Sequence, residues 1–324
     1  MRILIIGAAG MVGSKLAASL ADDAESGVEA MTLVDMTEPT APGSAKMPVG
    51  TGRLDITDAQ AVAEVIAAKP DVIFHLAAIV SGEAEADFEK GYAVNFDGTR
   101  NIFEAIRAHA NYHPRVVFTS SIAVYGAPFP DPIPDDYFLT PLTSYGTQKL
   151  MGEAMLADYS RRGIFDGVGL RLPTICVRPG RPNKAASGFF SNILREPLVG
   201  KEAVLPVSDE VRHWHASPRA AVGFLRHAMT MDTGPMGARR SVTLPGLSAT
   251  VAEQIEALRR AAGDEAVKLI RREEDPAIVK MVAGWPTRFE AKRARDLGFV
   301  AESSFDEIIA AHVEDELGGR IGPR

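Results

Sequence analysis

Tyr145 and Lys149 are the residues whose types and spacing point most directly to chemistry. They lie four residues apart in SYGTQK, so both side chains share one face if this segment is a helix. A free tyrosine titrates near pH 10 and is a poor base at neutral pH, but a lysine ammonium beside it lowers its pKa. The pair therefore predicts a general base for an alcohol proton. The spacing alone is common on amphipathic helices, where the same residues can be a half-buried Tyr and a solvated Lys.

Hydroxyl residues precede this pair in TSSIAVYG, residues 119–126. They end a strand-like run and would lie at the carboxyl edge of a parallel sheet, where ligands bind in such folds. Ser121 can hydrogen-bond the reacting oxygen, and Ser120 is the competing choice. The sequence has no Gly-x-Ser-x-Gly elbow, which argues against a Ser-His-Asp hydrolase.

A glycine-rich turn, GAAGMVG, lies between a predicted strand and a predicted helix. Its early glycines allow a tight turn and close approach of a pyrophosphate to backbone amides, while the positive end of the helix dipole faces that anion. Its last glycine would let the helix pack against the sheet. The turn predicts a dinucleotide site that comprises Gly7, Ala9, Gly10, Met11, Val12 and Gly13.

Asp35 ends the second predicted strand, at the distance from the turn where a carboxylate binds the adenosine ribose. A carboxylate repels a 2′-phosphate, and no Lys or Arg follows until Lys46, so NAD is favoured over NADP. Asp55 and Ile56 either lie at the adenine edge or form a loop or cap, and the sequence leaves both open. His75 is predicted to be a packed strand residue, because the seven histidines show no metal-ligand spacing and no metal is expected.

Several motifs together resemble the extended short-chain dehydrogenase/reductase family, of the NAD-dependent epimerase/dehydratase type. They are GAAGMVG, Asp35, HLAA (75–78), VNFDGTRNI (94–102), SSIAVYG and YGTQK, and the resemblance covers about residues 1–175. It implies Ser121, Tyr145 and Lys149 as the catalytic set, with Lys149 also binding the nicotinamide ribose. It further implies that Asn95 supports the active-site helix and that Pro173 and Thr174 orient the nicotinamide amide. The other residues to which it gives a role at the cofactor site are Leu76, Ala77 and Ala78.

The second half of the chain departs from the sugar-nucleotide pattern of that family. In VRHWHASPRAAV (211–222), Arg212 is kept, while the usual Asp pair is replaced by Ser217-Pro218 or its neighbours. Upstream, polar residues gather that suit a small anion, because Arg forks match a carboxylate. They could equally bind phosphate or be solvated. This cluster contains Arg178, Arg181, Asn183, Lys184 and Ser187.

Residues 171–198 and RHWHASPRAA resemble, more narrowly, the D-erythronate dehydrogenase branch of the family. That branch implies NAD-dependent oxidation of the C2 hydroxyl of a four-carbon sugar acid to the 2-oxo acid. Ser121, Ile122 and Tyr145 would then contact the substrate. Its acid group would be held by Arg178, Lys184 and Ser187, and Arg212 could join them.

Two alternatives belong to other function classes. A nucleotide-sugar 4-epimerase or dehydratase would use the same triad with tightly held NAD. A dehydratase usually has an Asp-Glu pair where Ile122 and Ala123 stand, which argues against it. An NAD-binding regulatory protein would keep the glycine turn and lose the catalytic trio, which is intact here.

The elements that must position these residues alternate between strand and helix. Strands are expected at 2–7, 31–35, 71–78, 115–121 and 167–172, and helices at 12–20, 58–68, 88–109 and 144–162. Continuous apolar strands indicate a parallel sheet buried on both faces, so we expect an α/β, doubly wound Rossmann fold. The NAD-binding domain is expected at 1–172, with 217–244 returning to it. A smaller substrate-binding lobe is expected at 173–216 and 245–324.

Composition excludes several other classes of protein. The chain has 324 residues, 46% hydrophobic and 24% charged, with a net charge of −7. It is therefore not disordered, and it is a poor candidate for binding nucleic acid or anionic membrane. The single cysteine, Cys176, excludes an internal disulfide and a Cys-based zinc site.

Location and assembly can also be predicted. The N-terminal apolar run stops at Gly7, too early for a signal peptide, and no stretch reaches the ~18 apolar residues of a membrane span. We therefore expect a cytoplasmic protein. The helices at 88–109 and 144–162 carry more apolar positions than one sheet-facing stripe needs. Because family members pair these helices, we expect a homodimer.

Overall fold

The computed structural model describes residues 1–180 and 187–322, which divide into two compact units. The first contains Met1–Val124, Thr143–Arg171 and Val222–Val242, and the second contains Tyr125–Leu142, Leu172–Ala221 and Thr243–Arg324. Tyr125–Leu142, which was expected to belong to the NAD-binding domain, thus groups with the second unit. Arg181, Asn183 and Lys184 lie outside the described residues.

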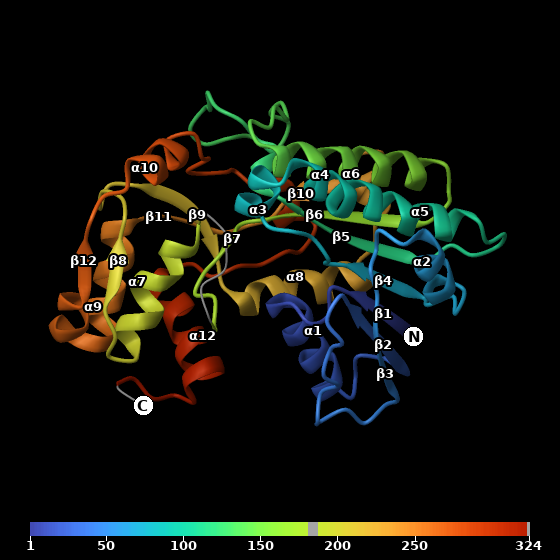
Figure 1. Ribbon diagram of the computed structural model, residues 1–324, viewed down its shortest axis with the longest axis horizontal. Helices are drawn as coiled ribbons and strands as arrows, with labels where there is room; N and C mark the ends of the chain where they lie inside the picture. The colour runs from blue at the N-terminus through green and yellow to red at the C-terminus, as the bar shows by residue number, and fades with distance from the viewer. Residues whose placement is uncertain (181–186, 323–324) are drawn as a thin grey trace. The chain divides into compact units, whose positions relative to one another are not determined.

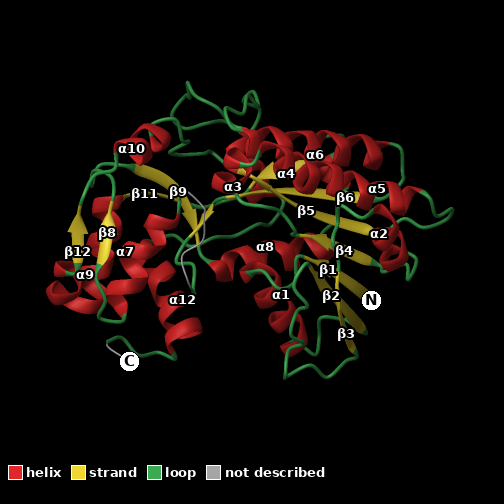
Figure 2. Cartoon of the chain, viewed as in Figure 1, coloured by secondary structure: helices red, strands yellow, loops and turns green. Residues whose placement is uncertain are grey.

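A seven-stranded sheet forms the centre of the first unit (Figure 2). Its strands in spatial order are β10 (Ser241–Thr243), β6 (Asp166–Leu172), β5 (Arg115–Ser121), β4 (Val72–His75), β1 (Arg2–Ile6), β2 (Ala30–Asp35) and β3 (Val49–Arg53). β3, β2, β1, β4 and β5 pair in parallel. The strand order reverses between β1 and β4, which is the switch point of a doubly wound sheet. The predicted fold class is confirmed.

Helices cover both faces of this sheet (Figure 1). One face carries α1 (Met11–Asp22) and α8 (Pro218–Thr230), where Arg226 of α8 donates to Ser19 Oγ at 2.8 Å. The other face carries α2 (Ala59–Ile66), α5 (Thr99–Arg107) and α6 (Ser144–Arg161). Two capping residues fix helix starts: Asp58 accepts from the first turn of α2, and Thr143 accepts from Gly146 N of α6.

The helix expected at 88–109 is present as a continuous helical run from Phe88 to Arg107, but its middle turns are π-helical rather than α-helical. After α3 (Ser81–Ala86) come α4 (Phe88–Gly91), the π-helical segment Tyr92–Gly98 and then α5. Such wide turns are rare and often mark functional sites. Here the segment carries Asn95 inward, where its side chain bonds to Ile79 and Gln148.

The strands are apolar on both faces because both are covered, as a parallel sheet requires. Phe74, Phe118 and Phe103 are fully buried, and Phe118 packs directly beneath α6. The helix can approach this closely because residue 152 is glycine. A Cβ at Gly152 would lie 2.7 Å from Phe118 Cζ.

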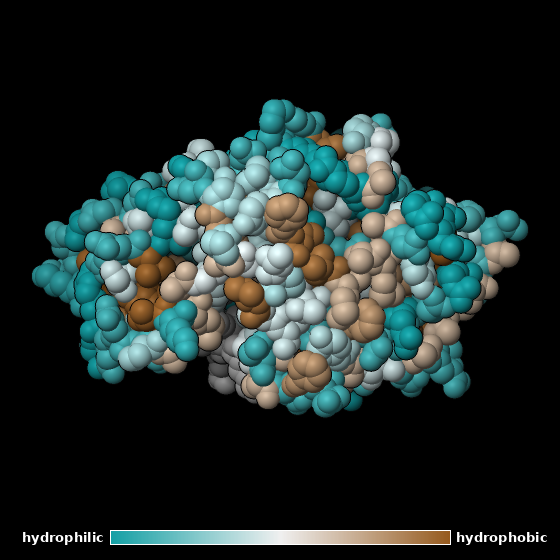
Figure 3. Space-filling view, turned by 90° about the horizontal axis from the view of Figure 1, so that it is seen from above, coloured by the Kyte–Doolittle hydropathy of each residue, from teal (hydrophilic) through white to brown (hydrophobic). Residues whose placement is uncertain are grey.

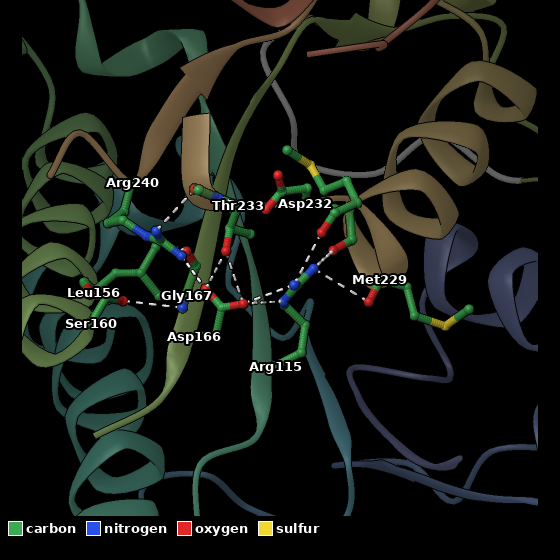
Figure 4. A network of polar contacts seen from close by, with 12 residues as sticks. Arg115, Leu156, Ser160, Asp166, Gly167, Met229, Asp232, Thr233 and Arg240 are labelled. Atoms are coloured by element: carbon green, nitrogen blue, oxygen red, sulfur yellow. Dashed lines mark hydrogen bonds and ion pairs between the residues drawn. The ribbon is translucent and has the colours of Figure 1, made fainter. Parts of the chain in front are cut away.

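A polar network ties the far edge of the sheet to the end of α8 (Figure 4). Asp166, at the start of β6, accepts from Arg115 Nε at 3.0 Å and also pairs with Arg240. Thr233 donates to the same carboxylate at 2.9 Å, and Arg115 Nη1 donates to the Ala228 carbonyl at 2.6 Å. Two arginines and a hydroxyl thus satisfy one carboxylate and join three chain segments.

The second unit is built from short strands and helices. One sheet orders β11 (Leu247–Thr250), β9 (Arg212–Ala216) and β7 (Thr174–Ile175), and the other pairs β12 (Ile270–Arg272) with β8 (Ala203–Leu205). Phe190, Leu258 and Ile308 lie at the centre of its core. No helix in the described part of the chain is long and apolar enough to cross a membrane. The helices of this unit include α7 (Gly188–Leu198), α9 (Val251–Lys268), α10 (Pro276–Val282), α11 (Lys292–Asp296) and α12 (Phe305–Leu317).

Gly152→Ala should lower the free energy of unfolding by about 1–3 kcal/mol, because the added methyl overpacks the contact with Phe118. Gly223→Ala on α8 is the matched control, since nothing lies within 4 Å of its added Cβ. The control should be neutral or stabilising by up to about 1 kcal/mol. Urea denaturation measures both, and equal effects at the two positions would contradict the packing argument.

Candidate active site

The glycine turn packs directly against the chain that follows β4. Gly7 has φ +95°, and a Cβ there would lie 2.5 Å from Ala77 N. A Cβ at Gly13 would lie 2.3 Å from the Gly7 carbonyl oxygen. Both glycines are therefore required by close backbone approach. They bring the carboxyl ends of β1 and β4 together with the start of α1, with Leu76, Ala77 and Ala78 directly after β4.

The turn fits a dinucleotide. No side chain caps the N-terminus of α1, and its first turn holds no acidic residue, so backbone amides and the helix dipole are open to an anion. Asp35 Oδ2 accepts a hydrogen bond from Ala9 N at 3.1 Å, which holds the carboxylate beside the turn. A pyrophosphate would lie at Gly10, Met11 and Val12, and a ribose would lie at Asp35.

Asp55 and Ile56 follow β3, and their side chains differ in exposure. The exposed Asp55 accepts from Thr57 N at 2.9 Å and from Thr57 Oγ1 at 2.7 Å, which is the geometry of a loop cap. Ile56 is buried against Gly98. These contacts favour the cap for Asp55, and a contact of this pair with adenine stays a prediction.

Tyr145 and Lys149 lie in the first two turns of α6, as the spacing predicts. Tyr145 is half-buried, while Lys149 is only 2% exposed. The Lys149 ammonium lies 5.8 Å from the centre of the Tyr145 ring and 5.0 Å from the centre of the Phe118 ring. It donates to the Thr119 carbonyl at 2.9 Å. A cation is thus held beside the phenol on one helix face.

The electrostatics of Lys149 follow from its burial. Desolvation lowers its pKa to about 8, and the negative charge of Glu153 opposes this change. Lys149 is therefore still mostly protonated at pH 7, although far less strongly than an exposed lysine. A buried cation of this kind stabilises a phenolate nearby.

The two serines at the end of β5 have different partners. Ser120 is buried and donates to Glu153 Oε1 at 2.5 Å. Ser121 is half-buried, and its Oγ accepts from Ala123 N at 3.1 Å. That contact leaves the hydroxyl proton of Ser121 available to a ligand. The geometry therefore favours Ser121 over Ser120, with the buried Ile122 next to it.

Asn95 joins the loop after β4 to α6. Its amide oxygen accepts from Ile79 N at 2.9 Å, and its Nδ2 donates to Gln148 Oε1 at 2.8 Å. Gln148 lies beside Lys149 on α6. Thr99 donates to the Asn95 carbonyl and is also bonded to His75 Nε2 at 2.8 Å. Burial lowers the pKa of His75 to about 3, so it is a neutral, packed strand residue, as expected.

In the second unit, Thr174 is bonded to a buried histidine. Its Oγ1 lies 2.7 Å from His213 Nε2, and His213 Nδ1 lies 2.9 Å from the Pro286 carbonyl. Burial lowers the pKa of His213 to about 4, so the ring is neutral. A carbonyl only accepts, so Nδ1 carries the proton and Thr174 donates to Nε2. The Thr174 oxygen therefore keeps lone pairs for a donor, while the adjacent Pro173 is buried.

The structure brings Arg178 and Ser187 together. Arg178 Nη2 donates to Ser187 Oγ at 2.8 Å, and Arg178 Nε donates to the Ile175 carbonyl at 2.9 Å. Both residues are half-buried. The other three members of the predicted cluster, Arg181, Asn183 and Lys184, lie outside the described residues.

Arg212 lies on the other face of β9 from the two histidines on which Arg178 acts. Arg212 and Trp214 alternate along β9 with His213 and His215, so they point to the other face of the strand. The positive charge of Arg178 acts on His213 and His215. On its own face, Arg212 lines a cavity of about 570 Å³ with Trp214, Ser248, Phe289, Asp131, Arg288 and Arg295.

No group of His, Cys, Asp or Glu among the described residues could hold a metal ion. Fold and site together define an NAD-binding enzyme of the doubly wound class, with a tyrosine–lysine pair at the carboxyl edge of the sheet. The sequence profile of the "NAD dependent epimerase/dehydratase family" matches residues 3–231. The chain belongs to this family, and it is an NAD-dependent oxidoreductase.

Two relatives match nearly the whole chain. A "D-erythronate dehydrogenase" of Cupriavidus necator is 45% identical, covering 97% of this chain and 98% of its own length. A protein of the same name from Haemophilus influenzae is 40% identical, covering 98% of this chain and 100% of its own length.

Solved structures share the fold. A "nucleoside-diphosphate-sugar epimerase" from Agrobacterium tumefaciens is 62% identical, with a TM-score of 0.96, covering 98% of this chain and 95% of that one. An L-threonine 3-dehydrogenase from Trypanosoma brucei is 24% identical, with a TM-score of 0.85, covering 99% of both chains, and it shows the fold alone.

Gln148, Glu153 and His213 are buried and contact predicted residues, but they carried no sequence prediction of their own. Gln148 and Glu153 flank Lys149 on one helix, so helical spacing could have pointed to them. His213 binds Thr174 across two strands that are far apart in the sequence. No local pattern could have found that contact.

Asp35 should make the protein bind NAD at least ~10-fold more tightly than NADP, because placing like charges together is costly. Asp35→Asn should reduce this ratio, since an amide does not repel a 2′-phosphate. Asp55→Asn is the control, because the Asp55 carboxylate is bonded to Thr57. Calorimetric titration measures the affinities, and equal binding of NAD and NADP by the unmodified protein would contradict the argument.

Proposed function

We propose that the chain is a dehydrogenase that oxidises the C2 hydroxyl of a D-erythronate-like four-carbon sugar acid to the 2-oxo acid, with NAD as cofactor. The observation that carries this proposal is the buried Lys149 beside Tyr145 and the end of β5. The two D-erythronate dehydrogenases, similar over nearly the full length, support this choice of substrate class.

Tyr145 is the proposed base. When bound, NAD supplies the acceptor for the hydride that leaves C2. Tyr145, as the phenolate that the ammonium of Lys149 stabilises, takes the proton of the C2 hydroxyl. The hydroxyl groups of Ser121 and Tyr145 orient the C2 oxygen between them, and Ile122 is an apolar neighbour of the substrate.

Residues of the second unit are proposed to bind the acid group. A four-carbon acid has little apolar area to bury, so its affinity must come from charge-assisted hydrogen bonds. The guanidinium of Arg178 is oriented by Ile175 and Ser187, which reduces the entropy lost on binding. Lys184 would add a second positive charge.

Cofactor contacts beyond the turn also remain proposals. We assign the nicotinamide ribose to Tyr145 and Lys149 and the carboxamide to Pro173 and Thr174. The Thr174 oxygen can accept from an amide N–H because its own proton is donated to His213. Asn95 would act indirectly, through α6.

A nucleotide-sugar 4-epimerase is the second candidate. Arg212, Arg288 and Arg295 line one cavity with two aromatic side chains, which suits a nucleoside diphosphate. The 62% identical structure also carries an epimerase name. Against this, Arg288 is already paired with Asp131 at 2.9 Å and Arg212 with Glu253 at 3.3 Å.

We also propose a cytoplasmic homodimer in which α5 and α6 meet their counterparts. Leu150, Met151 and Ala157 on α6 are partly exposed, and Ala154 is exposed. Seen from the side of these helices, the surface carries apolar patches among hydrophilic ones (Figure 3).

Tyr145→Phe should lower kcat by about 100-fold or more while NAD still binds, because only the proton acceptor is removed. In the unmodified enzyme, kcat should rise with pH as Tyr145 loses its proton. It should fall above about pH 8, the pKa of Lys149, as that residue loses its charge. Steady-state rates from pH 6 to 10 measure both the rise and the fall of kcat. A near-normal kcat in Tyr145→Phe would show that another group is the base.

Arg178→Ala should lower kcat/KM for a free four-carbon 2-hydroxy acid by about 10–100-fold, the cost of one charged contact. Arg212→Ala is the matched comparison and should leave that value nearly unchanged. The assay follows NADH formed from free sugar acids and turnover of UDP- and dTDP-sugars. Turnover of a nucleotide sugar that depends on Arg212, with no NADH from any sugar acid, would establish the epimerase instead.

A further inference from the structure

Glu153 lies one helical turn after Lys149 on α6, and its side chain is only 5% exposed. Its carboxylate accepts from Ser120 Oγ at 2.5 Å, from Arg171 Nε at 3.0 Å and from Arg171 Nη2 at 2.7 Å. Ser120 belongs to β5 and Arg171 to β6. One buried carboxylate therefore joins the active-site helix to two neighbouring strands.

The helix holds two consecutive residues of β5 directly before Ser121. Lys149 donates to the Thr119 carbonyl at 2.9 Å, and Glu153 accepts from the side chain of Ser120. Gly152, between these two contacts, allows the helix to lie against Phe118. The contact of Ser120 with Glu153 therefore fixes the end of β5, of which Ser121 is the last residue.

Among the described groups that affect the pKa of Lys149, one carries a negative charge that favours the charged ammonium. The Phe118 and Tyr145 rings, the Thr119 carbonyl and the neutral His75 face the ammonium from β5, α6 and β4. Glu153 supplies the negative charge, and Arg171 binds its far side. Without Glu153, the cost of burying the lysine charge would be opposed only by uncharged groups.

We propose that Glu153 is a positioning residue of the catalytic site: bound to Ser120 and Arg171, it keeps Lys149 charged and holds Ser121 in place. This inference rests on the proposed function, because it takes Lys149 and Ser121 as working groups. Glu153 itself contacts neither substrate nor cofactor and acts through its neighbours.

The test is Glu153→Gln, which keeps the size of the side chain and an oxygen for Ser120 but removes the charge. Lys149 should then lose its proton at lower pH. The alkaline fall in NAD affinity and in kcat should move down by about one pH unit. Calorimetric titration of NAD from pH 6 to 10, without substrate, gives the first readout and the kcat profile gives the second. Glu153→Asp keeps the charge and should restore the position of the alkaline limb.

Glu104→Gln is the matched control. It removes a carboxylate on the neighbouring helix α5, where Glu104 accepts from Arg107 Nε at 3.0 Å. It should leave the alkaline limb in place. If Glu153→Gln fails to fold, the double variant Glu153→Gln/Arg171→Met removes both buried charges. It should move the limb in the same direction, because Glu153 is the charge that acts on Lys149.

The inference would be overturned if the alkaline fall in NAD affinity and in kcat stays at the same pH in Glu153→Gln or in the double variant. An equal shift in Glu104→Gln would overturn it as well. Failure of the proposed function looks different. There, Tyr145→Phe keeps its turnover, whatever Glu153 does to the NAD profile. If Tyr145→Phe is inactive while the limb stays unmoved, the proposed function stands and the role of Glu153 alone is rejected.

Discussion

The active-site half of this molecule depends on one electrostatic constraint, the burial of the Lys149 ammonium at the end of a parallel strand. Removing a charge from water costs free energy unless nearby polar or charged groups stabilise it. Here the Thr119 carbonyl, two aromatic rings and the Glu153 carboxylate surround the ammonium. Because these groups offset the cost of burial only in part, the pKa of Lys149 is lowered to about 8, and the residue keeps its charge at neutral pH.

The rest of the first unit positions that charge. Asn95 and Gln148 tie α6 to the loop after β4, and Gly152 brings the helix onto Phe118. The glycine turn also depends on close packing, because Gly7 lies against the backbone of Ala77 directly after β4. The glycine turn and α6 thus both depend on the loop that follows β4. Under the proposed function, this shared support would hold the cofactor beside Tyr145.

Much of this could be predicted from sequence, where the signal is local. The glycine turn, Asp35 and the Tyr145–Lys149 spacing each lie within one strand–turn–helix segment, and apolar periodicity indicates the parallel sheet. The π-helical segment at Tyr92–Gly98 could not be predicted, because its side chains fit an ordinary helix and tertiary bonds of Asn95 accompany the wider turn. That Arg212 lies on the other face of β9 from the histidines on which Arg178 acts could not be predicted either, because sequence does not show which neighbours each face of a strand meets. The bonds of Ser120 to Glu153 and of Thr174 to His213 join segments more than 30 residues apart.

The proposed reaction removes a hydride from C2 of a small sugar acid. The most direct measurement uses D-erythronate with deuterium at C2, incubated with the enzyme and NAD, and locates the label by mass spectrometry. The account predicts that the deuterium appears in the reduced cofactor, in step with formation of the 2-oxo acid. Deuterium retained in the sugar acid, with no reduced cofactor formed, would contradict it.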